Sequence, residues 1–261
     1  LVAAEVPVVA PLCLNGQTLH QAAGFAFSVS PRRGGRAPEL DDMDVLEWIG
    51  RFLARIHLVS ARSTFAHRPA LDVQSFGHVP RQWLLDQGAV AAEVETEWGL
   101  LSEQALALVG QAWDAAAVGQ AGGVQTIRLH GDCHPGNILW TPTDLAHGGP
   151  HFVDLDDARM GPAIQDLWML LSGERAQRTQ QLSMLLDGYE QMRELNRNEL
   201  ALIEPLRTLR LIHYSAWLAR RKDDPAFVQH FSWFGSSDYW AGQTHMLVEQ
   251  CEAMQEEPLY A

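Results

Sequence analysis

The sequence predicts an α+β protein in which helices dominate and strands are confined to two short regions. The opening stretch is rich in Val and contains an Asn-Gly turn signal, which is typical of β structure. Apolar residues then recur at helical spacing over much of the chain. A second short β region interrupts the helices near the middle. The predicted order is therefore a little β, helix, a small β hairpin, and helix to the end.

Two strands are predicted at the start, on either side of a tight turn. Val6–Leu12 and Phe25–Val29 are short apolar runs, and Asn15-Gly16 lies between them. Asn and Gly tolerate positive φ, so this pair favours a two-residue hairpin turn. Residues 31–38 (PRRGGRAP) are dense in turn formers and are predicted to connect two domains.

Helices are predicted from residue 43 onwards. Asp41 and Asp42 supply cap chemistry. One apolar face then recurs at helical spacing through Val45, Ile49, Phe52, Leu53 and Ile56. Further helices are predicted over residues 93–117, 163–172, 175–192, 198–222 and 237–255. Short strands are predicted over residues 126–129, 138–140 and 151–155, with a Gly-rich turn over residues 144–150.

Composition narrows the class of protein. The 261 residues are 47% hydrophobic and 20% charged, as in ordinary soluble globular proteins. No apolar run is long enough to span a membrane. The three cysteines, Cys13, Cys133 and Cys251, are far apart and odd in number, which predicts free thiols and a cytoplasmic location.

The chain is acidic, and its basic residues are nearly all arginine. The net charge of -13 makes nucleic acid a poor partner, because an acidic surface repels phosphate backbones. Among the 19 basic residues, Lys222 is the only lysine. We expect a monomer that contacts neither nucleic acid nor membrane.

A cluster of polar residues follows two of the short strands. The segments HGDCHPGNILW (130–140) and FVDLDDARMGP (152–162) contain most of its members. Buried carboxylates beside apolar strands are costly unless they are paired or bind metal. Phosphoryl transfer requires such groups: a carboxylate that orients the acceptor hydroxyl, and oxygen ligands for magnesium. His130-Gly131-Asp132 with Asn137 matches the His-x-Asp-x-x-x-x-Asn spacing of protein kinases, and Asp154 follows on the returning strand.

Other interpretations of these residues remain. A single Asp after a strand is commonly a turn or cap residue. A metallohydrolase with His130, Asp132 and His134 as ligands would leave Asn137 and Asp154 unexplained. For His134 a structural role in the loop is favoured over metal ligation. Cys133 is expected to be a small filler, and Arg159 to form a structural ion pair.

At these residues the chain resembles a known family. HGDCHPGN is similar to the HGDxHxxN loop of the aminoglycoside phosphotransferase and choline kinase family, which has a protein-kinase-like fold. The likeness is nearest to a bacterial Ser/Thr protein kinase of that family. It extends to EVPVVAPLCLNGQTL (5–19), RLHGDCHPGNILW (128–140), FVDLDDARMGPAIQDLWMLL (152–171) and IEPLRTLRLIHYSAWLARR (203–221).

The resemblance implies a role for each matching residue. Asp132 would be the catalytic base, and Asn137 and Asp154 would hold Mg²⁺. Four further residues would hold these three in place without contacting the substrate: His130, His134, Asp156 and Asp166. Asp166 would brace the catalytic loop. Residues 1–36 would be the remnant of a β-rich N-lobe and hinge, and residues 37–261 a mostly helical C-lobe. Ser30, Pro31, Arg32 and Arg33 would then border the adenine of ATP.

The chain departs from the family pattern at its front. Such kinases use a glycine-rich turn over the phosphates and a strand lysine on them. No lysine precedes the catalytic loop, and Gly34-Gly35 has no glycine partner at the required spacing. We therefore expect a truncated N-lobe, some tens of N-terminal residues to be absent from this chain, and weak or absent ATP turnover. Lys222 is expected at a solvated helix end.

The expected function is ATP- and Mg²⁺-dependent phosphotransfer to Ser/Thr of proteins. Two alternatives stay open. The acceptor could be an aminoglycoside, choline or another small hydroxylated molecule. The chain could also be an inactive, kinase-shaped binding module, which the missing lysine favours and the intact Asp132, Asn137 and Asp154 oppose.

Overall fold

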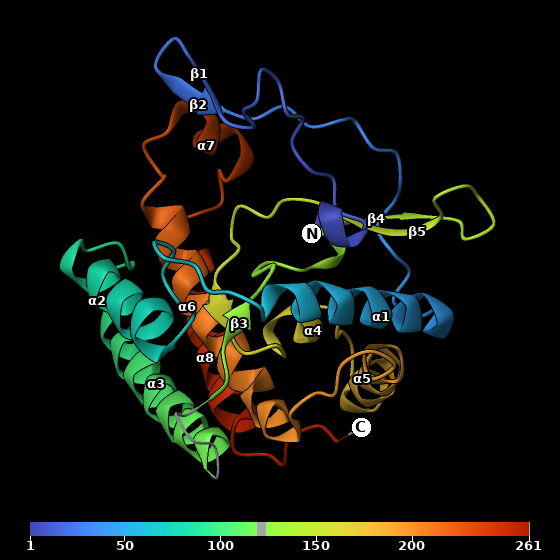
Figure 1. Cartoon of the computed structure of the whole chain (residues 1–261). Helices are drawn as coiled ribbons and strands as arrows, with labels where there is room; N and C mark the ends of the chain where they lie inside the picture. Colours follow the sequence, from blue (N-terminus) through green and yellow to red (C-terminus); the bar gives the residue numbers. More distant parts are fainter. Residues whose placement is uncertain (119–123, 261) are drawn as a thin grey trace.

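The computed structural model describes residues 1–118 and 124–260. Its helices are α1 (Met43–Ser60), α2 (Val79–Asp86), α3 (Glu95–Ala117), α4 (Gln165–Trp168), α5 (Arg175–Tyr189), α6 (Ile203–Ala219), α7 (Pro225–His230) and α8 (Ser237–Ala253). Its strands are β1 (His20–Ala22), β2 (Phe25–Phe27), β3 (Ile127–Arg128), β4 (Ile138–Thr141), β5 (Gly149–Phe152) and β6 (Met160–Gly161). Helices thus dominate, as the sequence predicts (Figure 1).

The strands form three separate antiparallel pairs in the described part of the chain: β1 with β2, β3 with β6, and β4 with β5. The β4–β5 hairpin is the predicted central hairpin, and it pairs Ile138 with Phe152. Its second strand ends at Phe152 instead of continuing to residue 155, so Asp154 lies in the loop beyond it. The N-terminal segment joins this hairpin, because Phe152 donates its N–H to Pro7 and accepts one from Val9.

The predicted strand over Val6–Leu12 is wrong. Only Val8 makes a β-bridge, to Phe152. Pro7 and Pro11 have no N–H to donate, so a continuous ladder cannot form across them. The predicted turn is confirmed: Asn15 and Gly16 have φ of 53° and 77°, between bridged Leu14 and Gln17.

The first paired strands lie further along the chain than predicted. β1 was not expected from the sequence, and β2 covers only the first part of the run over residues 25–29. The turn that joins them is Ala23-Gly24, with φ of 49° and 83°. Two positive φ values in succession are typical of the tight turns that suit the twist of a hairpin.

Most predicted helices are confirmed. α1 begins after Asp42, whose Oδ1 accepts the N–H groups of Asp44 and Val45 at 3.0 and 3.3 Å. The helix predicted over residues 163–172 contracts to α4, and α5 ends at Tyr189. The segment 198–222 divides into a 3-10 helix over Arg197–Leu202 and α6. α2 was not predicted, because a helix of only 8 residues gives little periodicity.

Two glycines allow α1 and α5 to pack in direct backbone contact. A Cβ on Gly50 would lie 2.0 Å from the carbonyl oxygen of Leu185. A Cβ on Gly188 would lie 1.9 Å from that of Glu47. Neither space admits a methyl group, so both positions require glycine at this helix separation. The close pair forms one side of the core, and α3, α6 and α8 pack together on the other.

Among the described residues, no helix is both long and apolar enough to cross a membrane.

Candidate active site

The backbone of the loop between β3 and β4 is held by hydrogen bonds to one buried carboxylate. Asp166, on α4, is fully buried. Its Oδ2 accepts the N–H of His130 at 2.8 Å, and its Oδ1 accepts the N–H of Gly131 at 2.9 Å. Gly131 has φ of 89°, and a Cβ there would lie 2.2 Å from the carbonyl oxygen of Asp157. The loop can therefore turn at this point only with glycine.

A chain of buried hydrogen bonds connects Asp166 to α1 and α5. His57 Nε2 lies 3.0 Å from Asp166 Oδ2, and His57 Nδ1 lies 2.8 Å from the Tyr189 hydroxyl. Because an ionised Asp166 can only accept, Nε2 of His57 donates the hydrogen bond to it. Burial acts to raise the pKa of Asp166, but the hydrogen bond and nearby charge of His57 hold that pKa below its usual value.

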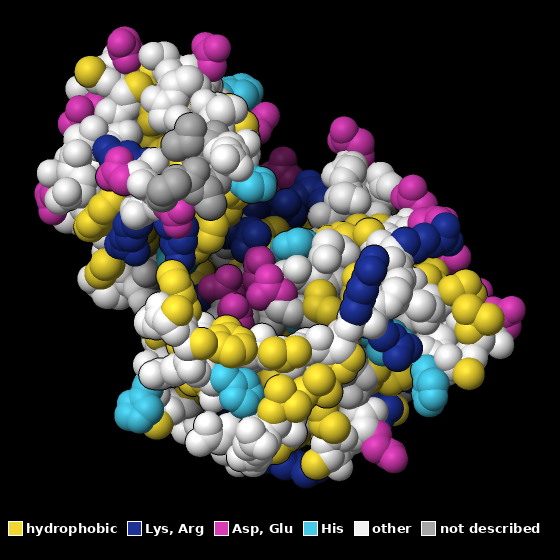
Figure 2. Space-filling model, turned by 90° about the horizontal axis from the view of Figure 1, so that it is seen from above, with side chains coloured by type: hydrophobic (Ala, Val, Ile, Leu, Met, Phe, Trp, Pro, Cys, Tyr) yellow, Lys and Arg dark blue, Asp and Glu magenta, His cyan; other side chains and the backbone are white. Residues whose placement is uncertain are grey.

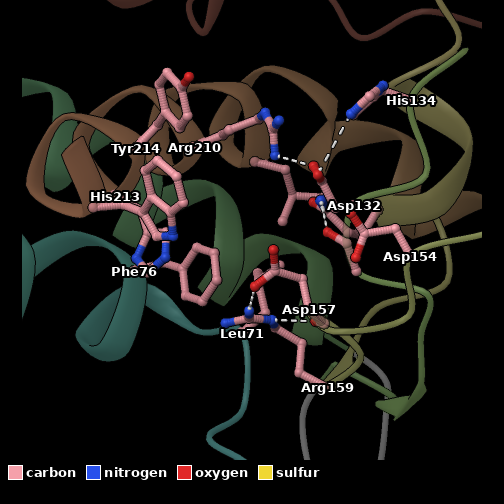
Figure 3. Close-up of a pocket in the computed structure, with 14 residues that line it drawn as sticks. Leu71, Phe76, Asp132, His134, Asp154, Asp157, Arg159, Arg210, His213 and Tyr214 are labelled. Carbon is pink, nitrogen blue, oxygen red and sulfur yellow. Dashed lines mark hydrogen bonds and ion pairs between the residues drawn. The ribbon is translucent and has the colours of Figure 1, made fainter. Parts of the chain in front are cut away.

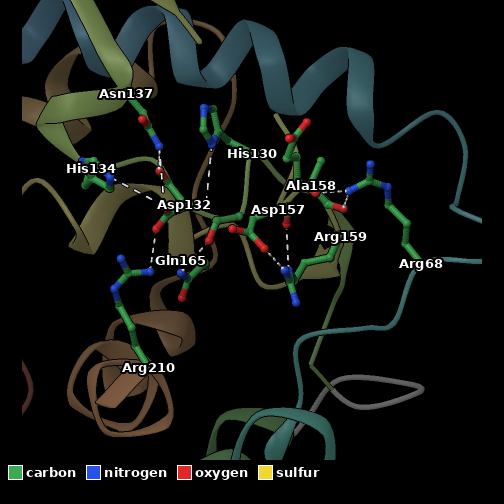
Figure 4. Close-up of polar contacts among 12 residues, drawn as sticks. Arg68, His130, Asp132, His134, Asn137, Asp157, Ala158, Arg159, Gln165 and Arg210 are labelled. Atoms are coloured by element: carbon green, nitrogen blue, oxygen red, sulfur yellow. Dashed lines mark hydrogen bonds and ion pairs between the residues drawn. The ribbon is translucent and has the colours of Figure 1, made fainter. Parts of the chain in front are cut away.

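Asp132 lies at the tip of this loop and is in contact with three side chains. Its Oδ1 lies 2.5 Å from Nη1 of Arg210, on α6. Its Oδ2 lies 3.5 Å from His134 Nε2 and 3.5 Å from Asn137 Nδ2 (Figure 4). The Asn137 amide also donates to the backbone oxygen of Asp132 at 2.9 Å. Asn137 therefore fixes the loop that carries Asp132.

His134 is primarily a loop-closing residue. It precedes the 3-10 turn over Pro135–Asn137, and its Nδ1 accepts the N–H of Gly136 at 3.0 Å. This contact is compatible with the structural role predicted for it. His130 is likewise engaged, because its Nε2 lies 2.9 Å from the carbonyl oxygen of Val153. The expected filler role of Cys133 agrees with its complete burial, which raises the pKa of its thiol well above the usual value.

Asp154 approaches Asp132 from the β4–β5 hairpin. It has φ of 59°, a left-handed conformation that is uncommon for a residue other than glycine. Strain of this kind is concentrated at functional sites. Within the residues that the structure describes, its carboxylate has no hydrogen-bond or ion-pair partner. Asp132 and Asp154 both line one cavity of about 300 Å³ (Figure 3).

Arginine, histidine and aromatic side chains form the opposite wall of this cavity. Arg159 forms the predicted ion pair, with Asp157. His213 stacks on Phe76 with ring centroids 3.9 Å apart. Burial, together with the charge of Arg159, lowers the pKa of His213 to about 4, so its ring is neutral at pH 7. Figure 2 shows acidic side chains at the bottom of a hollow with basic ones beside them.

Some predicted site residues lie outside this cavity. Ser30, Pro31 and Arg32 are exposed in the extended segment after β2. Arg33 donates to the carbonyl oxygen of His147, in the turn between β4 and β5. The Asp156 side chain is exposed and is not among the residues that line the cavity, whereas Asp157 is. Lys222 is exposed after α6, as predicted.

The donor atoms fit magnesium bound together with phosphate. The described residues contain no cluster of three or more His, Cys, Asp or Glu that could hold a metal alone. Magnesium, however, is commonly bound through one or two carboxylates plus phosphate oxygens. Asp154 offers an unpaired carboxylate, and the amide nitrogen of Asn137 is engaged on Asp132, which leaves its amide oxygen free. The metallohydrolase set fails, because His130 is turned to Val153.

Sequence reasoning missed several residues of the cavity. Arg210, His213 and Tyr214 come from α6, more than 70 positions after the loop. The only indication of these residues in the sequence is that polar side chains recur on one face of a helix that is otherwise apolar. Phe76 lies in no motif, whereas Asp157 belongs to the segment FVDLDDARMGP but was given no role of its own. The arrangement presents one carboxylate that can take a proton, one that can bind a cation, and a wall that can bind an acceptor.

Comparison with known proteins gives a consistent result. Residues 1–202 match the model of the phosphotransferase enzyme family (APH). The chain is 43% identical over 259 residues to stress response kinase A of Escherichia coli O157:H7. It is 42% identical to the serine/threonine protein kinase RdoA of Salmonella typhimurium. Each alignment covers 99% of this chain and 75% of the relative.

Solved structures share the fold at low sequence identity. One is amicoumacin kinase hAmiN in complex with AMP-PNP, Ca²⁺ and Ami, with a TM-score of 0.66 and 17% identity; it covers 99% of this chain and 75% of that one. Another is a microcompartment-associated aminopropanol kinase, with a TM-score of 0.65 and 20% identity over 97% and 79% of the two chains. The predicted kinase-like fold of the aminoglycoside phosphotransferase type is confirmed.

Proposed function

The chain belongs to the phosphotransferase enzyme family and is a kinase, and from this premise we propose that it transfers the γ-phosphoryl group of ATP to Ser or Thr of a protein. The single observation that supports this most is that two carboxylates, Asp132 from the loop and Asp154 from beyond the hairpin, line one cavity, with Asn137 hydrogen-bonded to Asp132. Phosphoryl transfer requires little covalent chemistry from the protein, so positioned carboxylates are the expected machinery.

Asp132 is the catalytic base in this proposal. It accepts the proton of the acceptor hydroxyl while that oxygen forms a bond to the γ-phosphorus. The bond from the γ-phosphorus to the bridging oxygen breaks, and the nucleoside diphosphate leaves. A base must lie within hydrogen-bond reach of the proton that it takes. The anchoring of Asp132 through Gly131, Asp166 and Asn137 restricts it to one position.

Asn137 and Asp154 would hold magnesium. Bound magnesium neutralises charge on the transferring phosphoryl group. Asp154 is suited to this role because its carboxylate is unpaired among the described side chains and its backbone is held in a left-handed conformation. We assign Ser30–Arg33 the role of bordering the adenine, His130 and Asp166 that of holding the loop, and Asp156 only a peripheral role.

A protein acceptor is preferred because the relatives above 40% identity include one named a serine/threonine protein kinase. The structures named as kinases of small molecules are at most 20% identical in the comparisons above. A small hydroxylated acceptor is the second candidate. The three free cysteines, two of them buried, are compatible with a reducing cytoplasm as the site of action.

Transfer of labelled γ-phosphate tests this function. The chain, in excess over nucleotide, is incubated with Mg²⁺-ATP and either a generic Ser/Thr protein, an aminoglycoside panel or choline. Asp132→Asn serves as the blank, since it keeps the size of the side chain but cannot take the proton. We expect label on the protein acceptor above the blank, with a loss of about 10²-fold or more in Asp132→Asn.

Label on a small molecule alone would replace the protein acceptor by the second candidate. Equal label with the chain and with Asp132→Asn would reject Asp132 as the base. Omitting Mg²⁺ should abolish transfer, and Asp154→Asn should raise the Mg²⁺ concentration needed for half-maximal transfer. An unchanged Mg²⁺ requirement in Asp154→Asn would reject its role as a ligand.

A further inference from the structure

The Arg210 guanidinium is paired with the carboxylate of Asp132, the proposed catalytic base. Arg210 Nη1 lies 2.5 Å from Asp132 Oδ1, and the other carboxylate oxygen lies 3.5 Å from His134 Nε2 and from Asn137 Nδ2 (Figure 4). An acceptor hydroxyl must come within about 2.6–3.2 Å of this carboxylate to give up its proton. Arg210 must therefore yield its position when the acceptor arrives.

The charges around the cavity indicate what draws Arg210 away. Asp132 is paired with Arg210 and Asp157 with Arg159, and His213 is neutral because of its lowered pKa. A polycationic acceptor would meet two guanidinium groups and, once Asp154 holds a cation, no unpaired carboxylate of the lining. A carboxylate or phosphate beside the acceptor hydroxyl would instead offer Arg210 a new partner, and guanidinium groups bind both in a forked geometry.

The cavity continues past Arg210 into a second one. This neighbouring cavity of about 630 Å³ lies between α6 and α8, and Arg210 and Tyr214 line both. Arg207 lines it one turn before Arg210, on the same face of α6. Arg207 is paired through Nε with Glu204 at 3.1 Å, and its Nη2 atom is buried without a hydrogen-bond partner in the described structure. Because Arg207 is already paired and Glu249 also lines this groove, an acidic residue entering it would be recognised at Arg210, which lies where the two cavities meet.

We propose that Arg210 is the acceptor-recognition residue of this kinase: it holds Asp132 in the free chain and moves onto an acidic residue beside the Ser or Thr of a protein segment. The segment continues along the groove towards Arg207. The exchange frees Asp132 only when an acceptor of this kind is bound. The inference rests on the proposed protein-kinase function and adds to it the class of sequence that is phosphorylated.

Peptide binding tests this proposal separately from phosphate transfer. Fluorescent Ser peptides with Glu flanking the Ser, and matched peptides with Gln in place of Glu, are titrated into the full chain and followed by anisotropy. The variants are Arg210→Gln, Arg210→Lys and Arg51→Gln. Arg51 is a matched control, because it pairs with Glu47 at a similar exposure (28% against 35% for Arg210) and does not line the groove.

The Glu peptide should bind the chain about tenfold more tightly than the Gln peptide, as one charge-assisted hydrogen bond implies. Arg210→Gln should abolish this preference, because no guanidinium remains to pair with the Glu of the peptide, and it should not weaken binding of the Gln peptide. Arg210→Lys should keep part of it, and Arg51→Gln all of it. In the transfer assay, Arg210→Gln should raise KM for the Glu peptide and leave kcat within about twofold.

Equal affinity for the two peptides, or a preference that survives Arg210→Gln, would overturn the proposal. So would a small hydroxy acid that displaces the Glu peptide at equal concentration. Failure of the kinase function has a different signature, because binding and its dependence on Arg210 would persist while no label is transferred.

Discussion

Two buried carboxylates on neighbouring segments have pKa values shifted in opposite directions. Asp166 is held ionised by His57 and by the backbone of the loop that it anchors. Glu199 accepts the N–H of Ile164, just before α4, at 3.0 Å, but burial raises its pKa to about 7. Since α4 carries Asp166, the protonation of Glu199 is coupled to the element that positions the catalytic loop.

We expect Glu199 to make the protein less stable as the pH rises from about 4.5 to 7. Its folded-state pKa lies above its unfolded value, so its contribution is complete below pH 4.5 and is lost as the pH rises through about 7. The shift corresponds to about 3 kcal/mol. Urea unfolding of the chain and of Glu199→Gln at pH 5 and pH 7.5 measures it. Relative to the parent, the free energy of unfolding of Glu199→Gln should rise between pH 5 and pH 7.5.

The exposed Glu194 provides the control for this experiment, since Glu194→Gln changes the same charge without the buried contact. His213 acts in the opposite direction, because its pKa is lowered to about 4 and its contribution is lost as the pH falls below 6.5. The difference between parent and variant removes this background. A difference that is the same at both pH values would contradict the role of Glu199.

At the residue scale, the sequence predicted those site residues that belong to one local spacing. Asp132 and Asn137 are five positions apart, and a loop of that length brings the Asn137 amide to 3.5 Å from the Asp132 carboxylate, although only Asp132 lines the cavity. Asp154 could be predicted because a hairpin returns the chain to the same edge. Arg210 could not, since a helix 78 positions after Asp132 brings it to that carboxylate, and no pattern along the chain records that distance.

At the element scale, the α1–α5 pair links the core to the site. Gly50 and Gly188 admit the backbone of the facing helix, and this separation brings His57 of α1 to Tyr189 of α5 and to Asp166. The sequence predicted both helices from periodicity but gave no indication of their contact, because a helical glycine more often marks a weak point than a close approach.

Replacing Gly188 by Ala should destabilise the protein by about 1–3 kcal/mol, the usual effect of overpacking a well-packed core. The added Cβ would lie 1.9 Å from the backbone oxygen of Glu47, which is too close for any rotamer change to relieve. Thermal or urea unfolding measures the change. Gly110→Ala, in α3, is the matched control, because a Cβ there meets nothing within 4 Å.

Gly110→Ala should be neutral or stabilising by up to about 1 kcal/mol, as expected from helix propensity alone. If both variants unfold at the same denaturant concentration as the parent, the two helices are not held at the separation described.

The strands were harder to predict from the sequence than the helices. Val6–Leu12 has the apolar composition of a strand, yet Pro7 and Pro11 leave it only one bridge, and composition alone does not reveal which N–H groups a neighbour requires.

At the scale of the whole molecule, arginines lie at the cavity that holds Asp132, whereas the lysine does not. The net charge is -13, yet Arg159 and Arg210 face the cavity, and Arg207 continues their line along α6. The only lysine, Lys222, is exposed after α6 and is absent from the lining of the cavity that holds Asp132. Kinases generally place a lysine on the nucleotide phosphates.

We therefore expect residues 1–261 to turn over slowly although transfer is detectable with the chain in excess. Without a lysine on the phosphates, Mg²⁺-ATP should bind weakly and be poorly oriented, so the steady-state rate should fall far below the roughly 1–100 s⁻¹ of kinases. A coupled assay of ADP release at saturating acceptor measures the rate, with Asp132→Asn as the blank and Arg51→Gln as a variant of unchanged rate. A rate within the usual range, abolished by Asp132→Asn, would show that the arginines and magnesium ligands of this chain suffice to position the nucleotide.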